Sequence, residues 1–368
     1  MIIKTISKTQ TEIYKGVGIL FIIFHNYFHW TSPSPGENEF GFSPTRINIF
    51  FHQIVKEPFE IINILFSYFG HYFVQAFIFI SAVGLTMSIL NKKSSYMNFI
   101  FQRLRKLYPL LIVTLVFVFF FRIFFENRLM NVTEWKEMFW KFLFIHVFLK
   151  NQAFSITGPL WFFGLIFQLY LLFPLLYKWI KQFDIKVFLL ISLFSYSAIF
   201  IEHYYIPLPE GVFFMVNSIA HLPEFCFGIY IALNSNKKIH SAVFIISVFV
   251  FILGNFFWAF YPFTFLSVMI IIYWIISNWF VFSEQESAKH KITSKINNFL
   301  VHVGKLSMLI FVIHGLMRSH FVDIFNQNWA IKLLGAFFFF IAVYGLSIPA
   351  SILYKNIYNL LFLCKKQK

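Results

Sequence analysis

The chain has few charged residues and almost no cysteine. Only 12% of its 368 residues are charged and 59% are hydrophobic, whereas a soluble domain has about 25% charged residues. This composition excludes an ordinary soluble enzyme and indicates an integral membrane protein, with no soluble domain appended. The two cysteines, Cys226 and Cys364, argue against a disulfide framework or a cysteine metal site.

Several recognisable segments are also missing. Residues 1–11 are polar, and the apolar run after them has no small-residue cleavage site, so we predict a retained first transmembrane helix rather than a signal peptide. The absence of a Walker-type loop, a dinucleotide-binding GxGxxG and a GxSxG elbow excludes the enzyme classes built on them. The net charge of +15 is scattered over short loops, so we predict no nucleic-acid partner.

Apolar stretches of bilayer-crossing length recur along the whole chain. We predict an all-α polytopic bundle forming one membrane domain, residues 1–368, with about ten spans. The predicted spans are residues 12–30, 66–90, 107–125, 158–178, 187–202, 212–234, 240–258, 262–282, 304–321 and 331–354. If the N-terminus is cytoplasmic, 21 of the 30 Lys and Arg residues fall on the inner side, so the positive-inside rule predicts that both termini are cytoplasmic.

Two outer segments are expected to carry structure of their own. Residues 31–65 contain several prolines, so we expect turns, a short surface helix and a role in capping a cavity and selecting the acceptor. Within residues 126–157, the apolar run 139–148 is too short to span and predicts an interfacial or re-entrant helix. No internal repeat is evident, which weakens an inverted-repeat transporter.

His25 lies inside the first predicted span, past its middle and toward the outer side. Ionisable groups at this depth usually face a cavity where they bind or react. A neutral imidazole is suited to remove a proton from a hydroxyl, so we predict a general base. The alternative is an interfacial histidine beside the aromatic belt of Tyr27, His29 and Trp30.

Arg103, Arg105 and Lys106 cluster at the inner end of the third predicted span. Guanidinium and ammonium groups suit the phosphates of a nucleotide or coenzyme. The alternative is a set of positive-inside anchors.

Other polar residues lie within predicted spans. Trp161, Gly164 and Gln168 share a helix face, so Gln168 either points into the bundle as a substrate contact or bridges helices. His71 lies on the same outer side as His25. Further along the chain, polar side chains either join a site or form satisfied bridges: His221 and Glu224 three residues apart, and His314 with Arg318 one turn later.

No metal is predicted. The histidines have no short motif spacing, and no carboxylate accompanies His25 in the sequence.

Five segments, taken in order, resemble the membrane acyltransferase-3 family: residues 15–25, 74–82, 103–109, 160–174 and 311–315. The resemblance covers nearly the whole chain. It implies a multi-pass O-acyltransferase of the bacterial inner membrane. Such enzymes usually take acetyl-CoA as acyl donor and modify surface polysaccharide, lipopolysaccharide or other exported molecules.

The resemblance also assigns residues. His25 corresponds to the family's essential histidine and Arg103 to Lys106 to its donor-binding motif, with Lys15 as a substitute for an arginine that the family has one place earlier. Lys106 replaces the second arginine of that motif, and Ile166 replaces a glutamate that often follows the Trp161 motif. Asn26, directly after the first matching segment, and Tyr170, inside the fourth, join His71, Trp161, Gln168, Glu224 and His314 as candidate substrate or supporting residues.

We therefore expect coenzyme A phosphates to dock on the inner cations, while the acyl group reaches His25 and is transferred to a glycan hydroxyl that His25 deprotonates. A two-step route through an acyl-histidine is an alternative. Two other functions remain open: a transporter or flippase for a lipid-linked sugar, which would use the same histidines and Glu224, and a non-catalytic component of a glycan assembly system.

Overall fold

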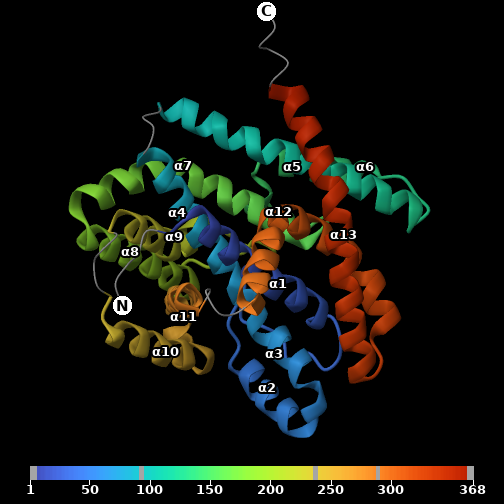
Figure 1. Cartoon of the computed structure of the whole chain (residues 1–368), viewed down its shortest axis with the longest axis horizontal. Coiled ribbons are helices and arrows are strands. Elements are labelled where there is room, and N and C mark those ends of the chain that lie inside the picture. Colours follow the sequence, from blue (N-terminus) through green and yellow to red (C-terminus); the bar gives the residue numbers. More distant parts are fainter. Residues whose placement is uncertain (1–5, 91–94, 235–238, 287–290, 363–368) are drawn as a thin grey trace, which may run out of the picture.

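The computed structural model describes residues 6–90, 95–234, 239–286 and 291–362, which are helical with short connections and contain no strand (Figure 1). Cys364 lies outside the described residues. The α-helices are α1 (Lys8–Phe28), α2 (Pro44–Lys56), α3 (Ile61–Phe69), α4 (Val74–Leu90), α5 (Tyr96–Phe124), α6 (Val132–Phe142), α7 (Trp161–Phe183), α8 (Ile185–Tyr204), α9 (Leu222–Leu233), α10 (Ser241–Phe256), α11 (Thr264–Glu286), α12 (Lys291–Phe325) and α13 (Trp329–Phe362). The predicted all-α class is confirmed.

Seven helical segments of the described chain are long and apolar enough to cross a membrane. They are Pro58–Leu90, Tyr96–Phe124, Gly158–Phe183, Ile185–Tyr204, Trp258–Phe280, Ile292–Phe325 and Trp329–Phe362. The remaining predicted spans are helical but shorter or more polar: α1 carries Glu12, Lys15 and His25, and two apolar helices end after 16 residues or fewer, Ser218–Leu233 and Ser241–Phe256. The chain is thus a multi-pass membrane protein, and the number ten and the orientation stay predictions.

Helix α1 lies in the middle of the bundle and packs along α12 (Figure 1). Two glycines permit the close approach. A Cβ on Gly16 would collide with the backbone of Leu300, and a Cβ on Gly304 would collide with the backbone of Glu12. Small residues bring membrane helices together in this way, and here they align two polar helices whose side chains form the sites described below.

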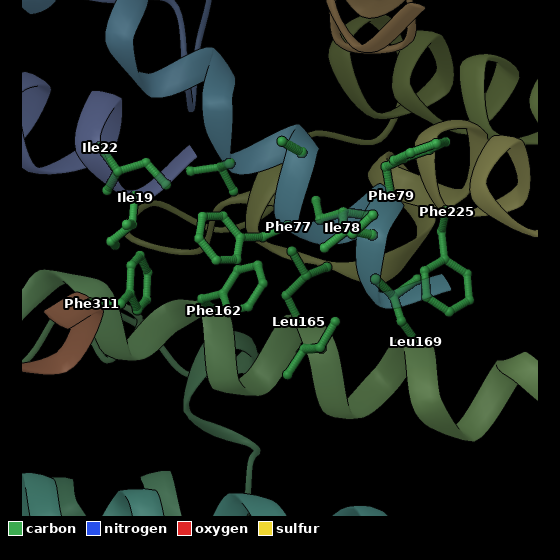
Figure 2. Close-up of a cluster of buried hydrophobic side chains, with 14 of the residues drawn as sticks. Ile19, Ile22, Phe77, Ile78, Phe79, Phe162, Leu165, Leu169, Phe225 and Phe311 are labelled. Atoms are coloured by element: carbon green, nitrogen blue, oxygen red, sulfur yellow. The ribbon is translucent and has the colours of Figure 1, made fainter. Parts of the chain in front are cut away.

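The apolar core joins α1, α4, α7, α9 and α12. Figure 2 shows the side chains of α4 interleaved between those of α7 and those of α1 and α9. Because the interior is close-packed, the positions of the polar side chains on these helices are set by the packing around them.

Both outer segments contain the expected short helices, with different boundaries. In residues 31–65, α2 is an amphipathic surface helix that buries Ile47 and Phe50 against the α3 residues Ile64 and Tyr68. In residues 126–157, the helix is α6, which begins and ends earlier than the predicted run 139–148. The chain leaves the helix because Phe144 has a left-handed φ of 59°, a conformation that a helix cannot continue.

Candidate active site

A cavity of about 790 Å³ opens between α1, α4, α5, α7, α12 and α13. Its wall carries side chains that bear the same charge and come from four different helices. These cations are Lys15 on α1, Arg103 and Lys106 on α5, Lys305 on α12 and Lys355 on α13. Lys15 is paired with Glu12, whose Oε1 lies 3.2 Å from its Nζ. The cations around the cavity outnumber this one carboxylate and repel each other unless an anion lies between them, so the cavity is suited to a polyanionic ligand.

The cavity unites three of the four predicted donor-binding cations. Arg103 and Lys106 lie three residues apart on one face of α5, and Lys15 joins them from α1. Arg105 faces away, and its guanidinium lies 5.5 Å above the Phe362 ring. Arg103 itself lies 5.0 Å above Phe99, and its buried Nε has no hydrogen-bond partner.

Three cavity residues were missed by sequence reasoning as site residues: His302, Lys305 and Lys355. The only sequence signal was the positive-inside pattern, which assigned both lysines to the inner side. Tyr170, a predicted supporting residue, lines the same cavity on α7.

A second polar centre surrounds His25, which is 4% exposed. The Nδ1 atom of His25 lies 3.0 Å from the carbonyl oxygen of Phe66. Since a carbonyl only accepts hydrogen bonds, this contact assigns the proton of the neutral ring to Nδ1 and leaves a lone pair on Nε2. The Nε2 atom lies 3.3 Å from Oε2 of Glu37.

Glu37 supplies the carboxylate that the sequence analysis did not place beside His25. The expectation that no carboxylate accompanies His25 is wrong, because Glu37 comes from the outer loop twelve residues later. Its Oε2 also lies 2.6 Å from Nδ1 of His29. Burial alone would raise the pKa of Glu37, but the charges of His25 and His29 outweigh it and lower that pKa to about 2, so Glu37 carries its negative charge at physiological pH.

The loop that carries Glu37 is fixed by Arg46 on α2. The Arg46 guanidinium donates hydrogen bonds to the backbone oxygens of Glu37 and Gly41 and to the side chain of Asn38. Gly36 precedes Glu37 with a φ of +77°, which only glycine adopts without strain. The outer loop thus places a carboxylate beside His25. Its role in capping a cavity stays a prediction, because no residue of 31–65, a segment that the structure describes in full, lines the cationic cavity.

Comparison with known families decides the class of the protein. A family model described as acyltransferase domain, acyltransferase-3, matches residues 12–355. The chain belongs to the acyltransferase-3 family. No curated protein and no solved structure matches the chain.

In this acyltransferase-3 chain, His25, His29 and Glu37 each offer one atom to a common point, and the three atoms lie within 4.8 Å of one another. Two imidazole nitrogens and a carboxylate oxygen are a donor set that binds Zn²⁺. The hydrogen bond from His25 to a backbone carbonyl is also typical of a metal-bound histidine. The absence of a metal therefore stays a prediction that elemental analysis can test.

We call His25, His29 and Glu37 the outer centre, after the side on which the sequence predicts them. Four more polar residues of the acyltransferase-3 chain surround it. The His71 ring lies 5.6 Å from that of His25, and neither of its nitrogens has a hydrogen-bond partner. It lies in a 3-10 helix, Gly70–Phe73, that leads directly into α4. Asn26 accepts a hydrogen bond of 3.0 Å from Arg318, and His314 is fully buried with Nε2 unpartnered.

Three predicted residues of the acyltransferase-3 chain lie at neither centre. Gln168 bridges helices: it donates to Asn217 and accepts from the backbone of Ser218. Trp161 packs edge-on against Phe40. Glu224 is buried elsewhere, with its Oε2 3.7 Å from Nδ1 of His221.

Proposed function

We propose that this protein is an O-acyltransferase of the bacterial inner membrane that transfers an acyl group, most simply acetyl, from acyl-CoA to a hydroxyl of a surface or exported glycan. The observation that carries the proposal is the pairing of two centres on one helix. Lys15, in the cationic cavity, and His25 are ten residues apart on α1, about 15 Å along the axis.

The cationic cavity would hold the donor's phosphates. Arg103 can bind a phosphate through two parallel N–H bonds, while lysines act as point charges. Lys15, Lys106, Lys305 and Lys355 surround it, which supports a ligand with several phosphates, such as coenzyme A. The acyl arm would then extend from the cavity toward His25.

His25 would act as the general base. Its Nε2 lone pair accepts the proton of the acceptor hydroxyl while the hydroxyl oxygen attacks the thioester carbonyl carbon. The new C–O bond forms, the C–S bond breaks, and the departing thiolate takes the proton back from His25. The negative charge of Glu37, 3.3 Å from Nε2, would stabilise the imidazolium that exists between these two proton transfers.

The test measures the surface-glycan mass of bacterial cells carrying the wild-type gene, the His25→Ala variant or neither. We expect one added acyl mass with the wild type only, because loss of a general base costs about 10²- to 10⁴-fold in rate. A His25→Ala protein that inserts and still acylates would contradict the role of His25. A wild type that inserts in the native host but adds no acyl mass would favour the transporter.

A further inference from the structure

The charge of the donor cavity changes along its length. On α5 the cations Arg103 and Lys106 are followed one to two turns later by the apolar Leu110, and on α12 Lys305 is followed one turn later by Leu309. On α1, Lys15 is followed by Gly18, against which the Phe77 ring packs. The cavity is therefore cationic at one end and apolar at the end that lies toward His25.

Two aromatic rings form the wall at the apolar end. Phe77 of α4 and Phe162 of α7 both line the cavity, and their rings meet edge to face with centroids 6.5 Å apart. Figure 2 shows the two rings facing each other between their helices. Phe162 is only 4% exposed, so the rings close the space rather than stand open to it.

A third ring extends this wall to the outer centre. Phe311 of α12 packs edge to face against Phe162, with centroids 5.5 Å apart, and its centroid lies 5.6 Å from that of His314. Arg318, one turn after His314 on α12, donates a hydrogen bond of 3.0 Å to Asn26, the residue after His25. Phe162 and Phe311 thus connect the cavity wall with the surroundings of His25.

The cavity does not extend past these rings. Its lining, within the described part of the chain, includes neither His25 nor His29, Glu37 or His71. A donor whose phosphates lie on the cations must therefore bring its acyl group past or against the three rings to meet His25.

We propose that Phe77, Phe162 and Phe311 are specificity-determining residues that limit the acyl group delivered to His25 to a short chain such as acetyl. This inference rests on the proposed acyltransferase function. Closely packed rings leave little room for added methylenes, and a methylene that fits badly in an apolar pocket changes kcat/KM by about 10- to 200-fold. Replacing a ring with a smaller side chain should make room for longer acyl groups.

The experiment compares acetyl-CoA, butyryl-CoA and hexanoyl-CoA with the purified full-length protein in detergent. The acceptor is surface glycan isolated from the native host lacking the gene, and the readouts are thiol release and glycan mass. The wild type should use acetyl-CoA at least 10-fold better than hexanoyl-CoA. Phe162→Leu should raise the ratio of hexanoyl to acetyl kcat/KM by about 10-fold or more, and Phe162→Trp should lower it.

The matched control is Phe163→Leu, because Phe163 is the next residue on α7, is fully buried and does not line the cavity. It should leave the ratio unchanged. If Phe162→Leu loses acetyl transfer through misfolding, Phe77→Leu provides the same comparison from α4.

Two results would overturn the inference: a wild type that uses all three donors equally, or an active Phe162→Leu or Phe77→Leu protein with the wild-type ratio. A wild type that transfers no acyl group from any donor overturns the proposed function instead. The two failures are therefore distinct.

Discussion

The two polar centres of this chain differ in the sign and arrangement of their charges. The inner cavity gathers cations from four helices around an open space, whereas the outer centre places the carboxylate of Glu37 between the imidazoles of His25 and His29. The difference suggests a division of roles. The inner centre keeps an excess of positive charge even with Lys15 paired to Glu12, which favours an anionic ligand, and the outer centre is suited to hold or move a proton.

Access to solvent explains why both charge arrangements are tolerated. Lys15 is paired with Glu12 at 3.2 Å, and salt and solvent in an open cavity screen the repulsion among the other cations. A carboxylate without water is costly unless a partner neutralises it. Glu37 has a close partner in His29, whose Nδ1 lies 2.6 Å from its Oε2, and its backbone oxygen accepts a hydrogen bond from Arg46.

The largest expected effect comes from removing the negative charge of the outer centre. Glu37→Gln keeps the shape of the side chain but should lower kcat by about 10- to 100-fold, because the imidazolium of His25 loses its counter-charge. KM for the acyl donor should change little. The measurement is acyl transfer to isolated surface glycan across pH 5 to 9, in which the kcat profile should also shift.

Glu39→Gln is the matched control two residues later on the same loop, and it should retain kcat and the profile. A Glu37→Gln protein with the wild-type pH profile would remove Glu37 from the proton transfer. Zinc bound one to one in the wild type and lost in Glu37→Gln would instead make His25 a metal ligand.

An effect of similar size, but on KM instead of kcat, is expected at the inner centre. Arg103→Gln should raise KM for acetyl-CoA by about 10- to 100-fold with kcat nearly unchanged, because a hydrogen bond between charged groups contributes about 1.5–3 kcal/mol. Steady-state kinetics at two salt concentrations would measure it. Arg105→Gln, which faces Phe362 instead of the cavity, should match the wild type. Equal KM effects in both variants would contradict the assignment of the cavity to the donor.

The smallest expected effect is on stability and concerns a lysine that belongs to neither polar centre. Lys141 of α6 is fully buried and donates to the carbonyl of Gln152 at 3.0 Å. Burial lowers the pKa of Lys141 from 10.5 to about 7. Between pH 7 and 10.5 the unfolded chain therefore binds more protons than the folded one, so the contribution of Lys141 to stability rises with pH over that window.

The melting temperature in detergent, measured at pH 7 and at pH 10, tests this point. Raising the pH from 7 to 10 should change the melting temperature of the wild type more favourably than that of Lys141→Met, by a few degrees or less. Lys136→Met, on the exposed side of the same helix, should behave as the wild type does. An identical pH response in both variants would contradict the pKa of Lys141.

Local sequence was a good guide wherever one helix decided the outcome. Hydropathy located the apolar helices, and His25 is buried in α1 as expected. Helical spacing alone also separates Arg103 and Lys106, which share a face, from Arg105, which points elsewhere. Of the three cations, Arg103 and Lys106 line the cavity and Arg105 does not.

Sequence by itself determined the membrane class, the family and the residues that stand out within single helices, because hydropathy and motif spacing are local properties of the chain. Tertiary structure alone decided which residues share a site. Glu37 reaches His25 through a loop held by Arg46, and Lys305 and Lys355 meet Arg103 only when α12 and α13 pack beside α5. Such meetings depend on packing between distant segments, which no local pattern records.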